Sequence, residues 1–221
     1  MIPPTRFIPI AEETGLIQPL GDWVFWETCR ILRDMKAQGI TGLRVAVNIS
    51  AQQLRNENLP LVVRGALTCY DLLPEDLELE ITESTAMQNP EITLSILNQL
   101  SGMGIVLAID DFGTGYSSLT YLKRLHVALL KIDQSFVRDM LSDPDDLAIL
   151  EGVISLAAAF SCQVIAEGVE TIEHGSALLK LGCELAQGYG IAKPMPAEQV
   201  TAWVASWRPN DAWFALPDVG D

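Results

Sequence analysis

The sequence predicts an α/β fold in which parallel strands alternate with helices and the sheet curves toward a barrel. Three features of the 221 residues carry this prediction. Short apolar segments typical of strands recur along the chain, and segments with helical periodicity lie between them. A polar residue also stands near the carboxyl end of each strand segment, which is where barrel enzymes keep their active sites.

The predicted strands are short runs of mostly apolar residues. We place them at residues 43–50, 77–82, 105–111, 129–133, 163–168 and 185–191. Helical patterns are clearest at residues 21–38, 89–103, 144–160, 170–182 and 196–207. Asn89 and Pro90 predict a helix start, while Gly104 and Gly182 stand where helices end.

Repeated βα units fit either a doubly wound sheet or a closed barrel. The glycine-rich phosphate loop of dinucleotide-binding folds does not follow the first predicted strand, which favours the barrel. Side chains alternate along a strand, so one face of each is apolar and packs against the helices. The other face carries a polar residue near each strand end: Asn48, Glu80, Asp110, Lys131, Glu167 and Gln187. In a barrel these side chains converge at one mouth.

Composition argues against several classes of function. Fourteen basic against twenty-nine acidic residues give a net charge of −15, which disfavours a nucleic-acid duplex as partner. No apolar run reaches the ~18 residues of a membrane span. Four scattered cysteines and two histidines do not form a zinc-binding pattern, so we expect buried, reduced thiols in a cytoplasmic protein. A DFG triplet at 111–113 lacks the accompanying motifs of protein kinases.

Asp110 and Asp111 stand side by side at the end of an apolar strand. Burying an ionised carboxylate without a partner costs several kcal/mol, so the pair predicts a bound cation, a shared proton or a cationic partner. Glycines and hydroxyl side chains predict a tight, hydrogen-bonded loop directly afterwards. The loop residues are Gly113, Thr114, Gly115, Tyr116, Ser117 and Ser118.

Side chains with oxygen donors dominate the predicted mouth: Asn48, Glu80, Asp110, Asp111 and Glu167. Oxygen-only sites suit Mg²⁺ or Mn²⁺, and sometimes Ca²⁺ in an inhibited form. The aspartate pair could bridge two ions about 3.5–4 Å apart, the arrangement used for in-line displacement at phosphorus. Lys131 beside the ions could orient or deprotonate a water. These residues imply hydrolysis of a phosphate ester.

Several motifs occur together in a specific order: FIPIAEETGLI, NIS, ELEITES, IDDFGTGYSSL, LKID, AEGVET and QGY. With these motifs the chain resembles the EAL-domain family of bacterial cyclic di-GMP phosphodiesterases, from Phe7 to about Trp207. The resemblance implies a modified (β/α)8 TIM-type barrel, of which this chain shows six βα units and lacks the first two strands. It also implies metal-dependent hydrolysis of cyclic di-GMP to linear pGpG. We expect an EAL domain over residues 1–207, incomplete at its N-terminus, and a tail over 208–221.

The resemblance also implies roles for individual residues. The five oxygen donors match the family's ligands for two Mg²⁺ or Mn²⁺ ions, with Ca²⁺ inhibitory. Three residues match catalytic positions: Lys131, Glu167 and Gln187. Glu83 matches the glutamate that holds the DFGTGYSS loop, Glu170 matches a carboxylate that supports the ligands, and Asp133 stands beside Lys131 in the matched motif. The DFGTGYSS loop and its following helix match the family's homodimer interface.

Three functions remain open from the sequence. The first is the phosphodiesterase itself. The second is a degenerate module that binds cyclic di-GMP or a partner protein without hydrolysis, because the family's Glu-Ala-Leu motif, which contributes a metal ligand, would lie just before Met1. The third is a non-functional fragment that aggregates through open sheet edges.

Overall fold

The computed structural model describes residues 2–115 and 119–214. Tyr116, Ser117 and Ser118 of the predicted loop therefore lie outside the described residues. The chain divides into two compact units. Unit 1 consists of Met1–Ala108 and Ser117–His126, and unit 2 consists of Ile109–Tyr116 and Val127–Asp221.

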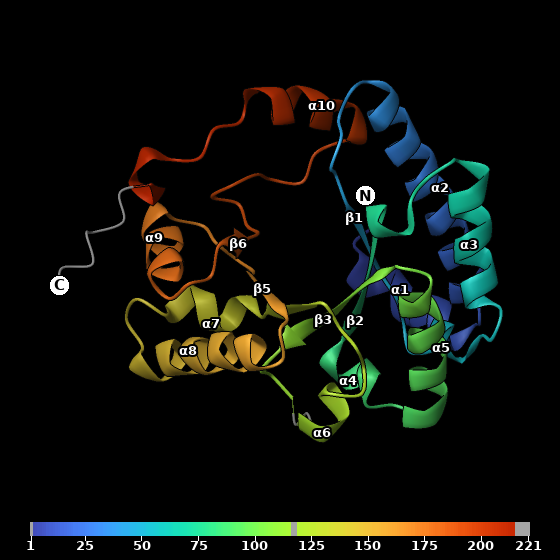
Figure 1. Cartoon of the computed structure of the whole chain (residues 1–221), viewed down its shortest axis with the longest axis horizontal. Helices are drawn as coiled ribbons and strands as arrows, with labels where there is room; N and C mark the ends of the chain where they lie inside the picture. Colours follow the sequence, from blue (N-terminus) through green and yellow to red (C-terminus); the bar gives the residue numbers. More distant parts are fainter. Residues whose placement is uncertain (1, 116–118, 215–221) are drawn as a thin grey trace. The chain divides into compact units, whose positions relative to one another are not determined.

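Unit 1 contains helices packed on two parallel strands. Its elements are α1 (Pro4–Glu13), α2 (Ile17–Ala37), β1 (Val45–Asn48), η1 (Gln53–Arg55), α3 (Leu59–Cys69), η2 (Pro74–Asp76), β2 (Leu77–Thr82), α4 (Glu83–Ala86), α5 (Pro90–Gly102) and α6 (Leu119–Leu122). The register pairs Val47 with Leu79 and Asn48 with Glu80. Figure 1 shows α2, α3 and α5 on one side of β1 and β2.

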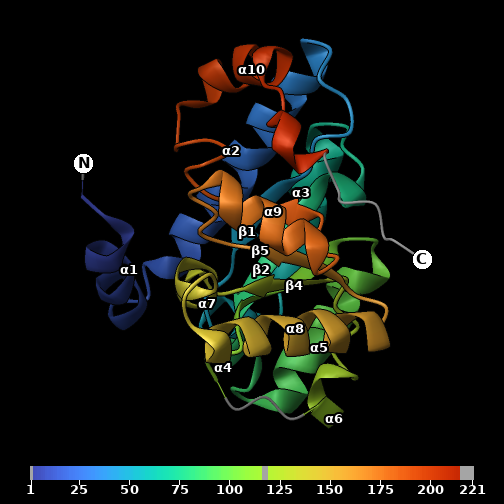
Figure 2. The ribbon, with the colours of Figure 1, turned by 90° about the vertical axis from the view of Figure 1, so that its left-hand side faces the viewer.

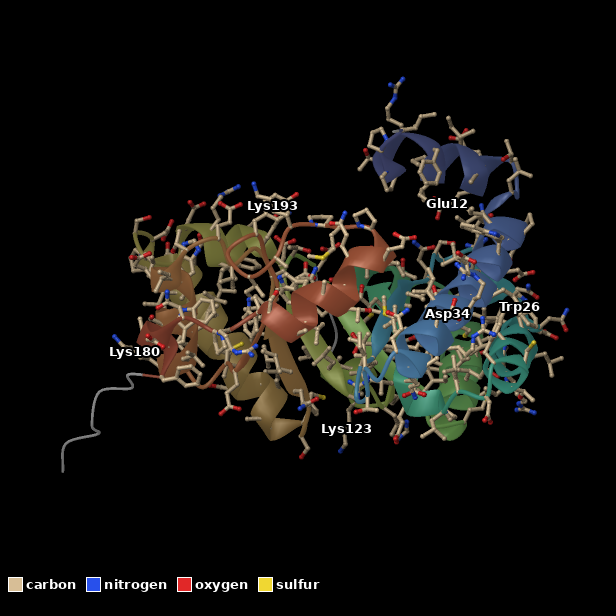
Figure 3. All side chains as sticks on the ribbon, turned by 90° about the horizontal axis from the view of Figure 1, so that it is seen from above. Glu12, Trp26, Asp34, Lys123, Lys180 and Lys193 are labelled. Atoms are coloured by element: carbon tan, nitrogen blue, oxygen red, sulfur yellow. The ribbon has the colours of Figure 1, made fainter. Side chains whose placement is uncertain are left out.

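The core of unit 1 lies between these helices and strands. Phe25 and Leu32 of α2 are fully buried, as are Leu79 of β2 and Leu100 of α5. Helix α1 lies apart from α2 and α3 (Figure 2), and Ile10 on α1 is 60% exposed. Figure 3 shows Glu12 at the end of α1 that leads into α2, which carries Trp26 and Asp34.

Unit 2 repeats the strand–helix pattern. Strand β3 (Val106–Phe112) enters it from unit 1, and the elements that follow are β4 (Leu129–Ile132), α7 (Gln134–Asp139), α8 (Pro144–Ala159), β5 (Gln163–Ala166), α9 (Ile172–Lys180), β6 (Leu185–Ala186), α10 (Ala197–Ser206) and η3 (Asp211–Trp213). Strands β4, β5 and β6 are parallel, with Lys131 opposite Ile165 and Ala166 opposite Ala186. Figure 1 shows α7 and α8 side by side next to β5.

Across the described residues the strands follow the order β1-β2-β3-β4-β5-β6 in a six-stranded sheet. This order confirms the predicted α/β class with six strands, each followed by a helical connection. The residues predicted to pack against the helices, Val47, Leu79, Ile109 and Ile132, are all buried. Glu80 and Lys131 on the opposite face are buried too, so burial does not separate the two faces. No helix among the described residues is long and apolar enough to cross a membrane.

Some local predictions need correction. Helix α2 begins at Ile17 rather than residue 21, and α1 and α3 were not among the predicted helices. Helix α5 does begin at Pro90, but Asn89 adopts a left-handed conformation (φ 44°) and its side chain makes no capping hydrogen bond. Strand β6 has two residues instead of seven, because a glycine-containing turn follows it.

The chain ends and cysteines add two further observations. Cys69 at the end of α3 is exposed, so the expectation of buried thiols fails there. In the described part of the predicted C-terminal tail, Trp213 donates its indole N–H to the Ile172 carbonyl at 3.1 Å. The first residues of the tail therefore pack against α9.

Candidate active site

The candidate site in unit 2 is a cluster of carboxylates around a buried lysine. Lys131 on β4 is 3% exposed. Its Nζ lies 2.6 Å from Glu167 Oε1 and 3.3 Å from Asp110 Oδ1. Asp110, Asp111 and Glu167 each offer a carboxylate oxygen, and these oxygens all lie within 4.8 Å of one another. Residues from three successive strands of the sequence thus meet at one point, as the parity argument predicted.

The turn at the end of β3 fixes the two aspartates. Asp111 has a left-handed backbone (φ 54°), which non-glycine residues adopt rarely and aspartate more readily than most. The Asp111 N–H donates to Asp110 Oδ1 at 3.0 Å, and Thr114 Oγ1 donates to the Asp111 carbonyl at 2.9 Å. Gly113 has a φ of 100°, and a Cβ there would lie 3.0 Å from the Phe136 ring. This geometry turns the side chains of adjacent residues toward the same cluster.

Negative charge is crowded in the cluster. Burial and, after it, the charges of Asp110, Asp133 and Glu167 together raise the pKa of Asp111 to about 6. A hydrogen bond with Asp133 acts in the same direction. A divalent cation at this point would be stabilised by the same charges that disfavour ionisation of Asp111.

Glu167 follows β5 directly, and a hydrogen bond of its backbone fixes its position. Its N–H donates to the Ile132 carbonyl at 3.1 Å, which extends the pairing of β5 with β4. Gly168 has a φ of 73°, and a Cβ at this position would lie 2.6 Å from Gln134 Cβ. The chain can therefore turn away immediately after Glu167 only because residue 168 is glycine.

Asp133 lies at the N-terminal end of α7, where its carboxylate is hydrogen-bonded. Its Oδ1 accepts hydrogen bonds from the Ser135 N–H at 2.9 Å and from the Ser135 hydroxyl. Asp133 thus caps α7 while it contributes charge to Asp111. Sequence reasoning did not single out Ser135 or Phe136, although the Asp-x-Ser spacing is typical of a helix start.

In unit 1 a second pair of predicted ligands meets. Asn48 Nδ2 donates to Glu80 Oε2 at 3.0 Å, as the β1–β2 register dictates. Glu80 is 5% exposed, whereas Asn48 is exposed. An open cavity of about 780 Å³ in unit 1 is bordered by Asn48 together with residues of α1 and α4.

Glu78, one pleat before Glu80, has a different partner. Its Oε2 lies 3.5 Å from the Arg44 guanidinium, and its side chain is buried. Glu78 lies on the same strand face as Glu80, but this ion pair favours a role in the fold.

The remaining predicted residues lie at the expected strand ends or loops. Gln187 follows β6 and is exposed, and Glu170 is exposed just before Thr171, whose side chain caps α9. Glu83 begins α4 and is 4% exposed. Among the described residues, Glu170 is not part of the carboxylate cluster, which consists of Asp110, Asp111 and Glu167.

The donors in unit 2 fit a hard divalent cation. All three are carboxylate oxygens close enough to share an ion, and they are partly buried. Lys131 supplies positive charge beside them, so the geometry could combine a cation with an ammonium group that holds a water or a phosphate oxygen.

Comparison with known proteins gives a consistent family. Residues 1–194 match the EAL domain model. The chain is 47% identical over 205 residues, or 93% of its length, to the bifunctional diguanylate cyclase/cyclic di-GMP phosphodiesterase MucR of Pseudomonas aeruginosa. It is 41% identical over 203 residues, or 92% of its length, to the cyclic di-GMP phosphodiesterase PdeR of Escherichia coli. These matches cover 30% and 31% of the two relatives, so the chain spans about a third of their length.

Solved structures agree with the sequence matches. A structure described as the PaMucR phosphodiesterase in complex with c-di-GMP has a TM-score of 0.86 and 47% identity, with 90% of this chain and 81% of that chain covered. The crystal structure of the EAL domain of Mycobacterium smegmatis DcpA has a TM-score of 0.81 and 40% identity, with 86% of each chain covered.

Proposed function

Because the chain belongs to the EAL domain family, we propose that it hydrolyses cyclic di-GMP to linear pGpG with divalent cations held by its carboxylates. The observation that carries the proposal is the cluster of Asp110, Asp111 and Glu167 around buried Lys131. Relatives named cyclic di-GMP phosphodiesterases, and a related structure solved with c-di-GMP, support this choice of substrate.

We assign the cation site to oxygen donors and hence to Mg²⁺ or Mn²⁺, with two ions in the complete site and Ca²⁺ as an inhibitor. Asp110, Asp111 and Glu167 would hold one of these ions directly, and we propose ligand roles for Asn48 and Glu80 as well. When bound, such cations polarise the phosphate and lower the pKa of a water.

The chain's own residues would then orient the reactants. Lys131 Nζ is anchored by Glu167 and Asp110, so its ammonium group would hold the attacking water or a phosphate oxygen in a fixed direction. The Asp111 N–H keeps Asp110 in place during this step. Gln187, one residue past β6, would hold a further water, and Glu83, Asp133 and Glu170 would support the loops around the site.

The wide cavity beside Asn48 supports binding of a nucleotide-sized molecule to unit 1. Its volume of about 780 Å³ lies in the ~300–1,000 Å³ range typical of ligand sites. The side chains that border it include amides and hydroxyls, such as Gln52, Ser50 and Thr82, which can hydrogen-bond bases or riboses.

We propose further that two copies associate through residues 112–118 and the following helix α6. The support is the family resemblance of the DFGTGYSS loop, of which residues 116–118 lie outside the described residues. Light scattering across a range of protein concentrations tests this. A mass of two chains is expected, and a single-chain mass at high concentration would contradict it.

The direct test of the function incubates the purified chain with cyclic di-GMP and Mg²⁺ or Mn²⁺. We expect pGpG to accumulate, EDTA to abolish the reaction, and replacement of Mn²⁺ by Ca²⁺ to stop turnover. Chromatographic separation of substrate and product provides the measurement. Nucleotide binding without pGpG would overturn the enzymatic assignment and favour the binding module.

A further inference from the structure

The segment after β6 runs alongside the segment after β5 in unit 2. Three backbone hydrogen bonds join them beyond the strand ends. The Gln187 N–H donates to the Ala166 carbonyl at 2.8 Å, and the Val169 N–H donates to the Gln187 carbonyl at 3.0 Å. The Gly190 N–H then donates to the Val169 carbonyl at 2.9 Å. Glu167 therefore lies between two backbone anchors, at Ala166 and at Val169.

The two segments lie so close together at residues 188 and 169 that residue 188 has to be glycine. A Cβ at Gly188 would lie 2.2 Å from the Val169 oxygen and 2.3 Å from the Val169 nitrogen, far inside the distances that real Cβ atoms show. At Gly190 the clash is milder, at 2.8 Å from the Glu170 carbonyl carbon and 3.0 Å from the Val169 oxygen. The clashing atoms belong to the backbone, so no side-chain rotation can relieve them.

The segment 167–169 is also constrained on the side that faces β4 and α7. The Glu167 N–H is bonded to Ile132 of β4, and Gly168 lies against Gln134 of α7. Val169 is fully buried. An atom added at residue 188 would therefore push the segment against β4 and α7, and the displacement would reach Glu167 only two residues from Val169.

We propose that Gly188 is a positioning residue for the cation site, because its missing side chain lets the 187–190 segment fix Glu167 through Val169. This inference rests on the proposed function of the carboxylate cluster. Cation ligands have to lie within about 0.2 Å of their preferred distances, so a small shift of Glu167 is expected to weaken binding. A glycine that served only the fold would change stability and leave cation affinity unaltered.

The test compares three glycine-to-alanine variants of the full chain. Gly188→Ala places its Cβ on the Val169 backbone, and Gly190→Ala makes the milder contact at Glu170. Gly152→Ala, on α8 in the same unit, is the matched control because nothing lies within 4 Å of its added Cβ. Equilibrium binding of Mn²⁺ to the metal-free proteins is measured together with amide hydrogen exchange at Val169 and thermal unfolding.

We expect Gly188→Ala to weaken Mn²⁺ binding by about tenfold or more, as outer contacts of metal ligands commonly do. Gly190→Ala should weaken it less, and Gly152→Ala should leave it unchanged. The Val169 amide should exchange faster in Gly188→Ala, and saturating Mn²⁺ should restore turnover. If Gly188→Ala does not fold, weakened binding by folded Gly190→Ala supports the proposal.

If Gly188→Ala and Gly190→Ala both fold and bind Mn²⁺ with wild-type affinity, the inference is overturned. Equal weakening of Mn²⁺ binding in Gly152→Ala would also overturn it. If Gly188→Ala does not fold, wild-type affinity in Gly190→Ala overturns it. A wild-type chain that binds Mn²⁺ and releases no pGpG would instead overturn the proposed function and leave the positioning role standing.

Discussion

Two lysine–carboxylate contacts in this protein are built differently. In unit 1, Lys36 on α2 pairs with Asp76 at the end of η2, and Asp76 also accepts the Leu73 N–H at 2.8 Å. In unit 2, Lys131 lies between Asp110 and Glu167, with the Asp111 carboxylate beside them. The first contact matches one carboxylate with one ammonium group across two elements, whereas the second gathers several carboxylates at one lysine.

The two contacts differ in the balance between their negative and positive charges. Crowding and burial raise the pKa of Asp111, so the cluster would be more stable if it lost a negative charge. The Lys36–Asp76 pair is balanced and ties its elements together, so it would be less stable if Asp76 were neutralised. The balanced pair serves the fold, whereas the charge of the crowded cluster fits the cation that we propose for it.

The largest expected effect comes from Asp110→Asn. Asp110 contacts Lys131 and accepts the Asp111 N–H, and we assign it to the cation site. Losing a cation forfeits several kcal/mol of transition-state stabilisation, so turnover should fall by about a thousandfold. The rate of pGpG release measures this, and a rate within tenfold of wild type would refute the assignment.

Lys131→Met should have the next largest effect. Methionine fills the buried space but cannot hold a water or phosphate oxygen. Removing a positioned proton-transfer group costs about a hundredfold or more, so kcat should fall while Mn²⁺ binding persists. If Mn²⁺ binding disappears in parallel with turnover, Lys131 serves to hold the carboxylates and not the reactants.

Asp76→Asn should lower stability and spare activity. The amide oxygen can still accept the Leu73 N–H, but the charge attraction to Lys36 is lost from a largely buried position. The free energy of unfolding should fall by about 2 kcal/mol, with turnover within about twofold of wild type. Urea denaturation tests the change, with exposed Asp71→Asn as a control that should have no effect.

The smallest expected effect is a gain in stability, and it comes from Asp111→Asn. The folded-state pKa of Asp111 is raised to about 6 from an ordinary 3.8, so the folded protein binds more protons than the unfolded chain between these values. Stability contributed by this group is therefore lost as pH rises through about 4 to 6. Asp111→Asn removes that loss, so the metal-free variant should melt a few degrees higher at pH 7–8 and gain nothing near pH 3.

Thermal unfolding of metal-free Asp111→Asn at both pH values checks the sign. Asparagine also tolerates the left-handed backbone at this position, so the substitution should not strain the turn. A lower melting temperature at pH 7–8 would show that the cluster is balanced after all and would remove the distinction from Lys36–Asp76.

Much of the fold could be predicted because strand parity and burial act locally. The alternation in LELEIT places Leu79 and Glu80 on opposite faces, and the register of β1 with β2 sets Glu80 opposite Asn48. Helices α1 and α3 were missed for physical reasons. Helix α1 contains Pro9 and buries little, while α3 is apolar over most of its length and carries Arg64 as its one charged residue.

The site was predictable in its residues but not in its contacts. Sequence order placed Asp110, Lys131 and Glu167 at strand ends, which is enough to bring them together in parallel strands. It could not reveal that Gly188 lies on the Val169 backbone or that Gly168 lies on Gln134, because those contacts depend on how loops from separate strands stack. The ligand and catalytic roles of these residues stay predictions.

Equilibrium Mn²⁺ binding to metal-free wild type, Asp110→Asn and Asp76→Asn tests the central claim most directly. Both variants make the same chemical change, one in the crowded cluster and one in the balanced pair. We predict that Asp76→Asn binds Mn²⁺ as wild type does and that Asp110→Asn binds it at least about a hundredfold more weakly. Equal affinity in Asp110→Asn and wild type would contradict the account.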